Sequence, residues 1–100
     1  MLTLIMAAQV VPISSKPVLQ VGIGTQLCSS AMDGKLSAAR ASWILGFWTG
    51  LNAVSGRSVG RKTNAQAIVA TVEQQCKALP TKPLALVTLA VYQAVAKADR

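Results

Sequence analysis

The chain has 100 residues, and 52% of them are apolar, so it is long and apolar enough to bury one hydrophobic core. It contains no histidine, and its only acids are Asp33, Glu73 and Asp99. This composition excludes a histidine-based catalytic triad, an imidazole metal site and a closely spaced pair of carboxylates. We therefore predict a non-enzymatic protein with no cofactor, no metal and no small-molecule substrate.

Basic residues outnumber acids by ten to three, which gives a net charge of +7. Such a charge favours nucleic acid, an anionic membrane surface or an acidic protein as partner. The basic residues are spread along the chain, and only Arg57, Arg61 and Lys62 cluster. No aromatic residue alternates with them to stack on bases, so nucleic acid is not the expected partner. We interpret the cluster as a candidate contact for an anion or an acidic partner, with a solvated basic loop as the alternative.

The two cysteines, Cys28 and Cys76, are the only thiols in the sequence. An even pair in a small chain without other metal ligands is typical of one disulfide in an oxidising compartment. The alternative is two buried free thiols in a cytosolic protein. Closing a loop of this length would stabilise the fold by about 4 kcal/mol in the chain-entropy model.

The first 13 residues are mostly apolar, about as long as the core of a signal peptide and too short to span a bilayer. No Lys or Arg precedes them, and Met6-Ala7-Ala8 only partly matches a cleavage site. We predict an export signal, whole or truncated, with a retained strand or helix as the alternative. Residues 1–24 are thus expected to form an apolar segment and loop, with at most a short extended piece at 18–23, and residues 25–100 a helical domain.

Residues 37–54 have the composition and spacing of a helix. One side carries bulky aromatic residues, and the other is small enough, at Gly46 and Gly50, to let a second backbone approach closely. Residues 41–56 carry no charge, which indicates a central or interface helix, and they are too few and too polar for a membrane span. Three of the four aromatic residues fall within this helix, either as core or with one tryptophan exposed as an anchor for a partner. The candidate partner-binding residues are Trp43, Gly46, Phe47, Trp48 and Gly50.

Two further helices follow a glycine-containing loop at residues 55–62. Thr63 and Gln66 are spaced as a capping box at the start of the first, and Pro80 ends it. Cys76 lies on its apolar side, while Glu73 and Lys77 can pair on the exposed side. Residues 84–96 form the last helix, with Pro83 in its first turn. The predicted helices and the cysteine pair together indicate an all-α fold, a small bundle of three to four helices with one disulfide.

Two glycine-containing segments approach nucleotide-binding motifs but depart from them. The pair Gly22 and Gly24 has Leu27 where a dinucleotide fingerprint needs its third glycine. Residues 56–63 end like a phosphate-binding loop, but Arg61 replaces the required second glycine. Neither segment predicts a nucleotide cofactor.

From residue 28 to residue 95 the chain resembles small exported bacterial proteins of the HdeA/HdeB acid-chaperone type and Rap-type immunity proteins. The resemblance rests on Cys28, on WILGFWTGLN at 43–52, on AIVATVEQQCKALP at 67–80 and on the helix at 84–95. It implies a periplasmic, HdeA-like helical fold, often dimeric, with a Cys28–Cys76 bridge, that binds other proteins. The chain departs from the acid chaperones in having only three acids, so a switch triggered by low pH would lack its proton acceptors.

Together these features predict a small periplasmic or secreted helical protein that binds another protein, or a second copy of itself, in a chaperone-like or immunity-like role. Two alternatives follow from the same residues. One is a basic cytosolic nucleic-acid-binding protein that uses the cluster at 57–62. The other is a peripheral membrane protein held by residues 1–13, although no membrane contact is expected once that segment is removed.

Overall fold

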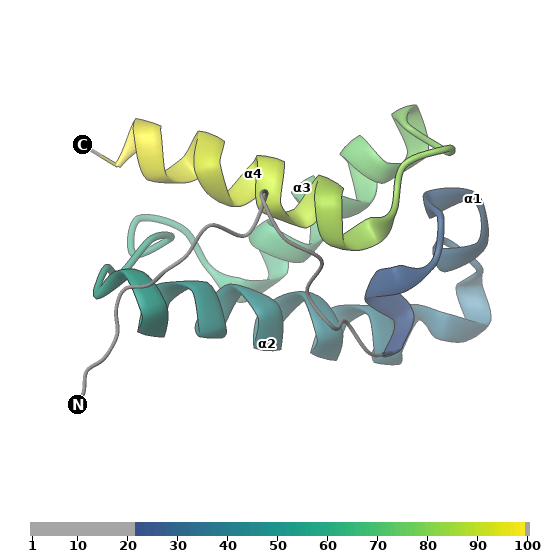
Figure 1. Cartoon of the computed structure of the whole chain (residues 1–100), viewed down its shortest axis with the longest axis horizontal. Helices are drawn as coiled ribbons and strands as arrows, with labels where there is room; N and C mark the ends of the chain where they lie inside the picture. The colour runs from purple at the N-terminus through teal and green to yellow at the C-terminus, as the bar shows by residue number, and fades with distance from the viewer. Residues whose placement is uncertain (1–21, 100) are drawn as a thin grey trace.

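Three long helices form the body of the protein, and a short one closes one end (Figure 1). The computed structural model describes residues 22–99, so the predictions for residues 1–13 and for 18–21 lie outside the described residues. The predicted extended piece at 18–23 is wrong at its last two residues, which belong to the 3₁₀ turn Gly22–Thr25. The α-helices are α1 (Cys28–Ala31), α2 (Ser37–Ser55), α3 (Ala65–Ala78) and α4 (Leu84–Ala98). Two 3₁₀ turns, η2 (Gly22–Thr25) and η3 (Gly34–Leu36), precede α1 and α2. The prediction of an all-α bundle with one disulfide is confirmed.

The longest helix, α2, runs within one residue of its predicted bounds. It ends at Gly56, whose φ of 69° is left-handed, and the Gly56 amide donates to the Asn52 carbonyl. Glycine is the residue that adopts this conformation without steric cost, which explains why the helix stops there. In residues 22–99, α2 and the other helices lack the combination of length and apolarity needed to cross a membrane.

The predicted start of α3 is wrong by one residue. Asn64, not Thr63, is the N-cap, and its Oδ1 accepts a 2.9 Å hydrogen bond from the Ala67 amide. Thr63 belongs to the preceding turn, where its amide donates to the Gly60 carbonyl. Asparagine and threonine are both good N-caps. Because Thr63 closes the turn at 60–63, Asn64 is the residue that caps the helix.

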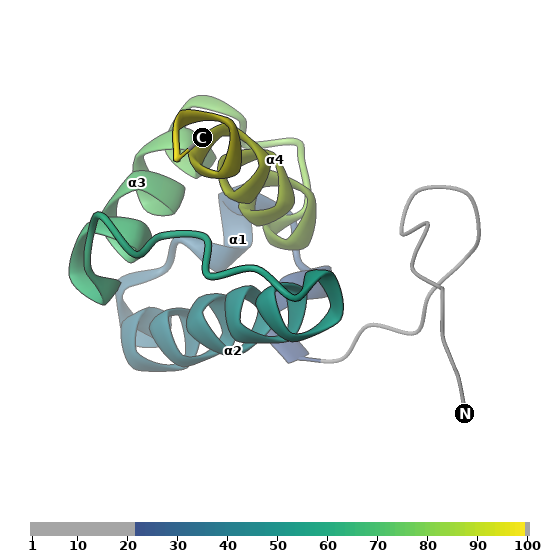
Figure 2. The same ribbon diagram turned by 90° about the vertical axis from the view of Figure 1, so that its left-hand side faces the viewer.

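A five-residue turn makes α3 and α4 a helical hairpin. Pro83 is the N-cap of α4 rather than part of its first turn. Seen along the bundle, α2, α3 and α4 surround a shared core, with α1 behind them (Figure 2). The largest fully buried side chains come from all the helices and are Ile44, Leu84, Val72, Thr88, Cys28 and Cys76.

The predicted disulfide joins α1 to the C-terminal half of α3. Cys28 and Cys76 are 48 positions apart in sequence, their Cα atoms lie 5.2 Å apart, and both are buried. Backbone hydrogen bonds reinforce this end of the bundle, because the Cys28 amide donates to the Lys82 carbonyl and the Ser29 amide to the Pro80 carbonyl. Backbone hydrogen bonds thereby fix the α3–α4 turn to α1, beside the disulfide that joins α1 to α3.

Candidate functional site

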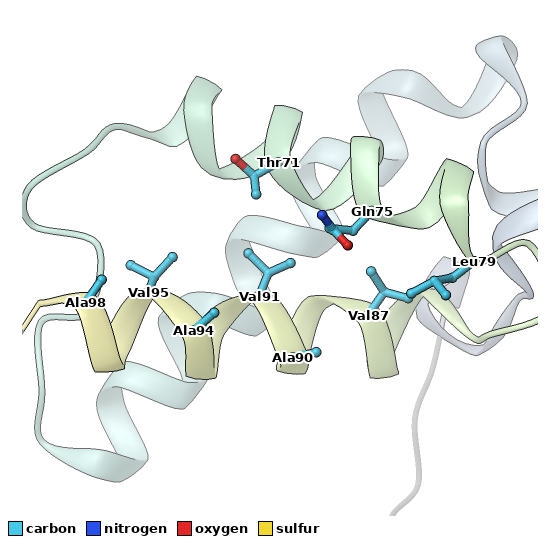
Figure 3. Close-up of a pocket in the computed structure, with 9 residues that line it drawn as sticks. All are labelled: Thr71, Gln75, Leu79, Val87, Ala90, Val91, Ala94, Val95 and Ala98. Atoms are coloured by element: carbon cyan, nitrogen blue, oxygen red, sulfur yellow. The ribbon is translucent and has the colours of Figure 1, made fainter.

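An apolar groove of about 410 Å³ lies between α3 and α4. We call it the α3–α4 groove. On one side the lining residues are spaced by four positions along α3 and its C-cap. On the other side, α4 contributes one row of valines and one row of alanines. The lining residues are Thr71, Gln75, Leu79, Val87, Ala90, Val91, Ala94, Val95 and Ala98. Figure 3 shows Thr71 and Gln75 pointing from α3 toward α4, and the three valines pointing back toward α3.

The groove is shallow on the α4 side because alanine recurs there at every fourth position, at Ala90, Ala94 and Ala98. These alanines are exposed, whereas Val87 and Val91 beneath them are 3% and 6% exposed. Where small side chains follow one face of a helix, the axis of a second helix can approach to about 8 Å, the short end of the usual range. The groove therefore has the shape that accepts an additional helix.

Exposed apolar residues continue from one end of this groove. Leu79, Leu86 and Leu27 are 41%, 53% and 46% exposed, and all lie in segments that meet at the α3–α4 turn. Leu27 reaches this turn through an antiparallel bridge to Pro83. Single exposed leucines are ordinary, but Leu79 lines the groove, and Leu86 lies one helical turn before Ala90 on α4, so apolar surface extends beyond the groove on that helix.

The acidic side chains of the protein are all bound within the fold. Glu73 Oε2 accepts from Arg40 Nε at 2.7 Å, and Asp99 Oδ2 accepts from the Gly60 amide at 2.9 Å. Asp33 Oδ1 accepts from the Lys35 amide, at the start of η3. None of these carboxylates lines the α3–α4 groove, as the structure describes it for residues 22–99. The predicted Glu73–Lys77 pair is wrong, because Glu73 turns toward Arg40 on α2 instead.

The aromatic residues predicted to bind a partner divide into two groups. Trp48 is only 3% exposed and donates from Nε1 to the Val59 carbonyl at 2.9 Å, so it is a core residue and not an exposed anchor. Its ring also meets Tyr92 edge to face, with centroids 5.0 Å apart. Trp43 and Phe47 are half-buried and stack on each other with centroids 4.8 Å apart. The Trp43 ring occupies the place where a side chain at Gly24 would lie.

The small-residue side of α2 is open. Gly46 and Gly50 are exposed, and a Cβ atom at either position would meet no described atom within 4 Å. In the described part of the chain, therefore, no second backbone uses the close approach that these glycines allow. Neither glycine is among the residues that line the α3–α4 groove.

The basic cluster has a structural role that the sequence did not reveal. An Arg57 guanidinium nitrogen donates to the Ala96 carbonyl, and one of Arg61 donates to the Asp99 carbonyl, each at 3.2 Å. Positive groups are favourable at a helix C-terminus, where carbonyl groups lack partners within the helix. Two of the three residues predicted to contact an anion, Arg57 and Arg61, thus cap α4. The third, Lys62, is exposed beside them.

Sequence reasoning missed Arg40 and the groove itself. Arg40 is 5% exposed, and its Nη1 donates to the carbonyl groups of Ala31 and Asp33 at 2.9 and 3.0 Å. An arginine near the start of a helix gives no sign in the sequence that it is buried. The groove did have a signal, because alanines spaced by four along an apolar helix indicate a face open to close packing.

Comparison with known proteins finds no protein-family model that matches the chain, and no curated protein or solved structure matches it either. The geometry of its own residues is therefore the basis for assigning a function.

Proposed function

We propose that the protein is a small exported binding protein, without enzymatic activity, that holds a helical segment of another protein in the α3–α4 groove. The observation that carries this proposal is the groove, an apolar surface bounded by two helices and floored by buried valines. Helix-in-groove binding is a common mode of recognition, in which apolar anchors of a partner helix enter such a surface.

The length of the groove sets the size of the segment that it accepts. From Val87 to Ala98, α4 advances by about 17 Å, or three helical turns. A partner helix of similar length presents anchors at positions i, i+4, i+7 and i+11. The contacts with α1 support this use. The Cys28–Cys76 bond fixes α3, and the backbone hydrogen bonds of Cys28 and Ser29 fix the α3–α4 turn, before a partner arrives, which lowers the ordering cost of binding.

The disulfide also supports export, to the periplasm or to the medium. Structural disulfides persist in oxidising compartments and are rare in the cytosol. The resemblance to exported acid chaperones and Rap-type immunity proteins implies a role in binding other proteins there. Control by acid is not the mechanism we propose, because within residues 22–99 the groove lining holds no carboxylate whose protonation would change its charge.

We do not favour the nucleic-acid alternative, because no aromatic residue alternates with the basic cluster to stack on bases. Arg57 and Arg61 each donate one hydrogen bond to a carbonyl group of α4, which holds their guanidinium groups at the end of that helix. The membrane alternative rests on residues 1–13, which lie outside the described residues.

The proposal is tested by placing a photo-crosslinking amino acid at chosen positions and irradiating the native cells. Ala94 and Gln75 lie on opposite walls of the groove, and both are exposed. We expect both positions to give an adduct with the same other protein. Ala38, an exposed alanine of α2, is the matched control and should give none. An adduct from Gly46 but from neither groove position would contradict the proposal and move the binding surface to α2.

A further inference from the structure

We infer that the segment held in the α3–α4 groove is an acidic amphipathic helix of a different protein, not a second copy of this chain. The inference rests on the proposed function and adds the chemistry of the partner. It follows from the distribution of charge around an apolar groove.

Basic residues stand at both ends of the groove. At the Leu79 end, Lys82 is an exposed residue of the α3–α4 turn, and its amide donates to the Leu79 carbonyl. At the Ala98 end, Lys97 is exposed in the last turn of α4, and the Arg61 guanidinium lies on the Asp99 carbonyl. Lys82 is thus three positions from Leu79, and Lys97 is next to Ala98, the lining residues at the two ends of the groove.

Within residues 22–99, no carboxylate is among the residues that line the groove. Glu73 is paired with Arg40, and Asp99, although charged, is 6% exposed and accepts a hydrogen bond from the Gly60 amide. A partner with glutamate or aspartate beside its apolar anchors would therefore gain attraction at both ends without displacing an existing pair. Complementary charge of this kind raises the association rate and rejects partners of the wrong sign.

The same charges disfavour pairing of two copies through this surface. Each chain has a net charge of +7, and an isologous contact would bring two sets of Lys82 and Lys97 toward each other. Like charges facing each other across an interface oppose binding. The groove thus selects for a partner of opposite charge.

Two synthetic peptides of about 14 residues, long enough to fill the groove, test the inference. Both carry leucine at i, i+4, i+7 and i+11. One has glutamate and the other lysine at the flanking positions, with alanine elsewhere. Each is titrated into the full oxidised chain while amide chemical shifts are followed by NMR. We expect the glutamate peptide to bind at least tenfold more tightly, to shift the amides of Thr71, Gln75 and Ala94, and to lose this advantage as salt is raised.

Matched variants locate the binding. Ala94→Gln places a longer side chain in the groove and should weaken binding of the glutamate peptide at least tenfold, whereas Ala38→Gln makes the same change on α2 and should leave it unaltered. Equal binding of both peptides at the groove would overturn the acidic assignment and leave the proposed function standing. Binding of neither peptide, binding indifferent to Ala94→Gln, or concentration-dependent dimerisation that Ala94→Gln abolishes would also overturn the inference. The crosslinking experiment judges the proposed function independently.

Discussion

Arg40 of α2 and Glu73 of α3 form an ion pair at 2.7 Å, and the same guanidinium donates to the last carbonyl group of α1. Their side chains are 6% and 26% exposed, so the pair is largely shielded from water. Three residues beyond Glu73, Cys76 bonds to the first residue of α1. One corner of the bundle thus joins three helices through a covalent bond and a charged cluster.

We predict that Arg40→Met lowers the free energy of unfolding by about 3 kcal/mol. The change leaves the Glu73 carboxylate without its counter-charge and two carbonyl groups without a donor, and breaking one side of a buried pair is costly. Urea unfolding measures the loss. Lys62→Met, at an exposed position, is the control and should change stability by less than about 0.5 kcal/mol. Equal effects of the two variants would show that the pair contributes no more than a surface charge.

A second polar cluster fixes the loop between α2 and α3. Asn52 Oδ1 accepts from the Val59 amide at 3.0 Å and from the Tyr92 hydroxyl at 2.8 Å, and its Nδ2 donates to the Val59 carbonyl. Asn52→Ala should cost about 2 kcal/mol and release the loop. Digestion of the folded protein with trypsin should then be faster after Arg57 and Arg61, as measured by the masses of the fragments over time.

Tyr92→Phe is the control for this loop, because it removes one hydroxyl and keeps both Asn52–Val59 hydrogen bonds. Its cost should be about 1 kcal/mol, with little change in the rate of cleavage. Cleavage that is as fast in Tyr92→Phe as in Asn52→Ala would mean that Asn52 does not hold the loop directly.

Two glycine-to-alanine changes should act in opposite directions. At Gly24 the new methyl group would meet the Trp43 ring, so Gly24→Ala should destabilise the fold by about 1–3 kcal/mol and alter tryptophan fluorescence. At Gly46 the methyl group enters open space in the middle of α2. Gly46→Ala should therefore stabilise the protein by about 0.5–1 kcal/mol, because alanine loses less backbone entropy.

Thermal unfolding of both variants checks these signs, and crosslinking from Ala94 checks the role of the α2 face. Adduct formation in Gly46→Ala should match that of the original protein. A more stable protein that no longer forms the adduct would show that the partner also packs on Gly46, so that the groove is not its only binding surface.

The sequence predicted the fold where local chemistry decides it. Pro80 disfavours helical conformation at the residue before it, and Gly56 readily adopts the left-handed conformation that ends α2. The apolar row that holds Cys76 identifies the inward side of α3. The N-cap of α3 was predicted wrongly because Thr63 and Asn64 are both suitable N-cap residues. The turn that ends at Thr63 leaves Asn64 as the N-cap. Local spacing could not show that Glu73 reaches Arg40, since that pair spans 33 positions and exists only when α2 and α3 pack.

The candidate site was predicted less well than the fold. Aromatic residues and basic charge predicted the partner surface. In the structure, however, Trp48 is a core residue, and Arg57 and Arg61 cap α4. The α3–α4 groove arises from two helices placed side by side, with Gln75 on one and Ala94 on the other. Each helix alone shows only half of it, so the angle and spacing between them had to be known.

The disulfide should contribute strongly to stability. The loop between Cys28 and Cys76 spans 48 positions, and opening it by reduction should lower the free energy of unfolding by about 4 kcal/mol. Urea unfolding with and without reductant measures this difference. A change below about 1 kcal/mol would mean that Arg40 and the backbone hydrogen bonds already hold α1 in place.

The thiol state of the protein in its native cells tests most directly the claim that an exported, disulfide-clamped hairpin carries the groove. Cells are quenched with an alkylating reagent, and the intact mass is measured with and without prior reduction. The account predicts no alkylated cysteine until reductant is added, and then two. Two alkylated cysteines without reductant would place the protein in a reducing compartment and contradict the proposal of export.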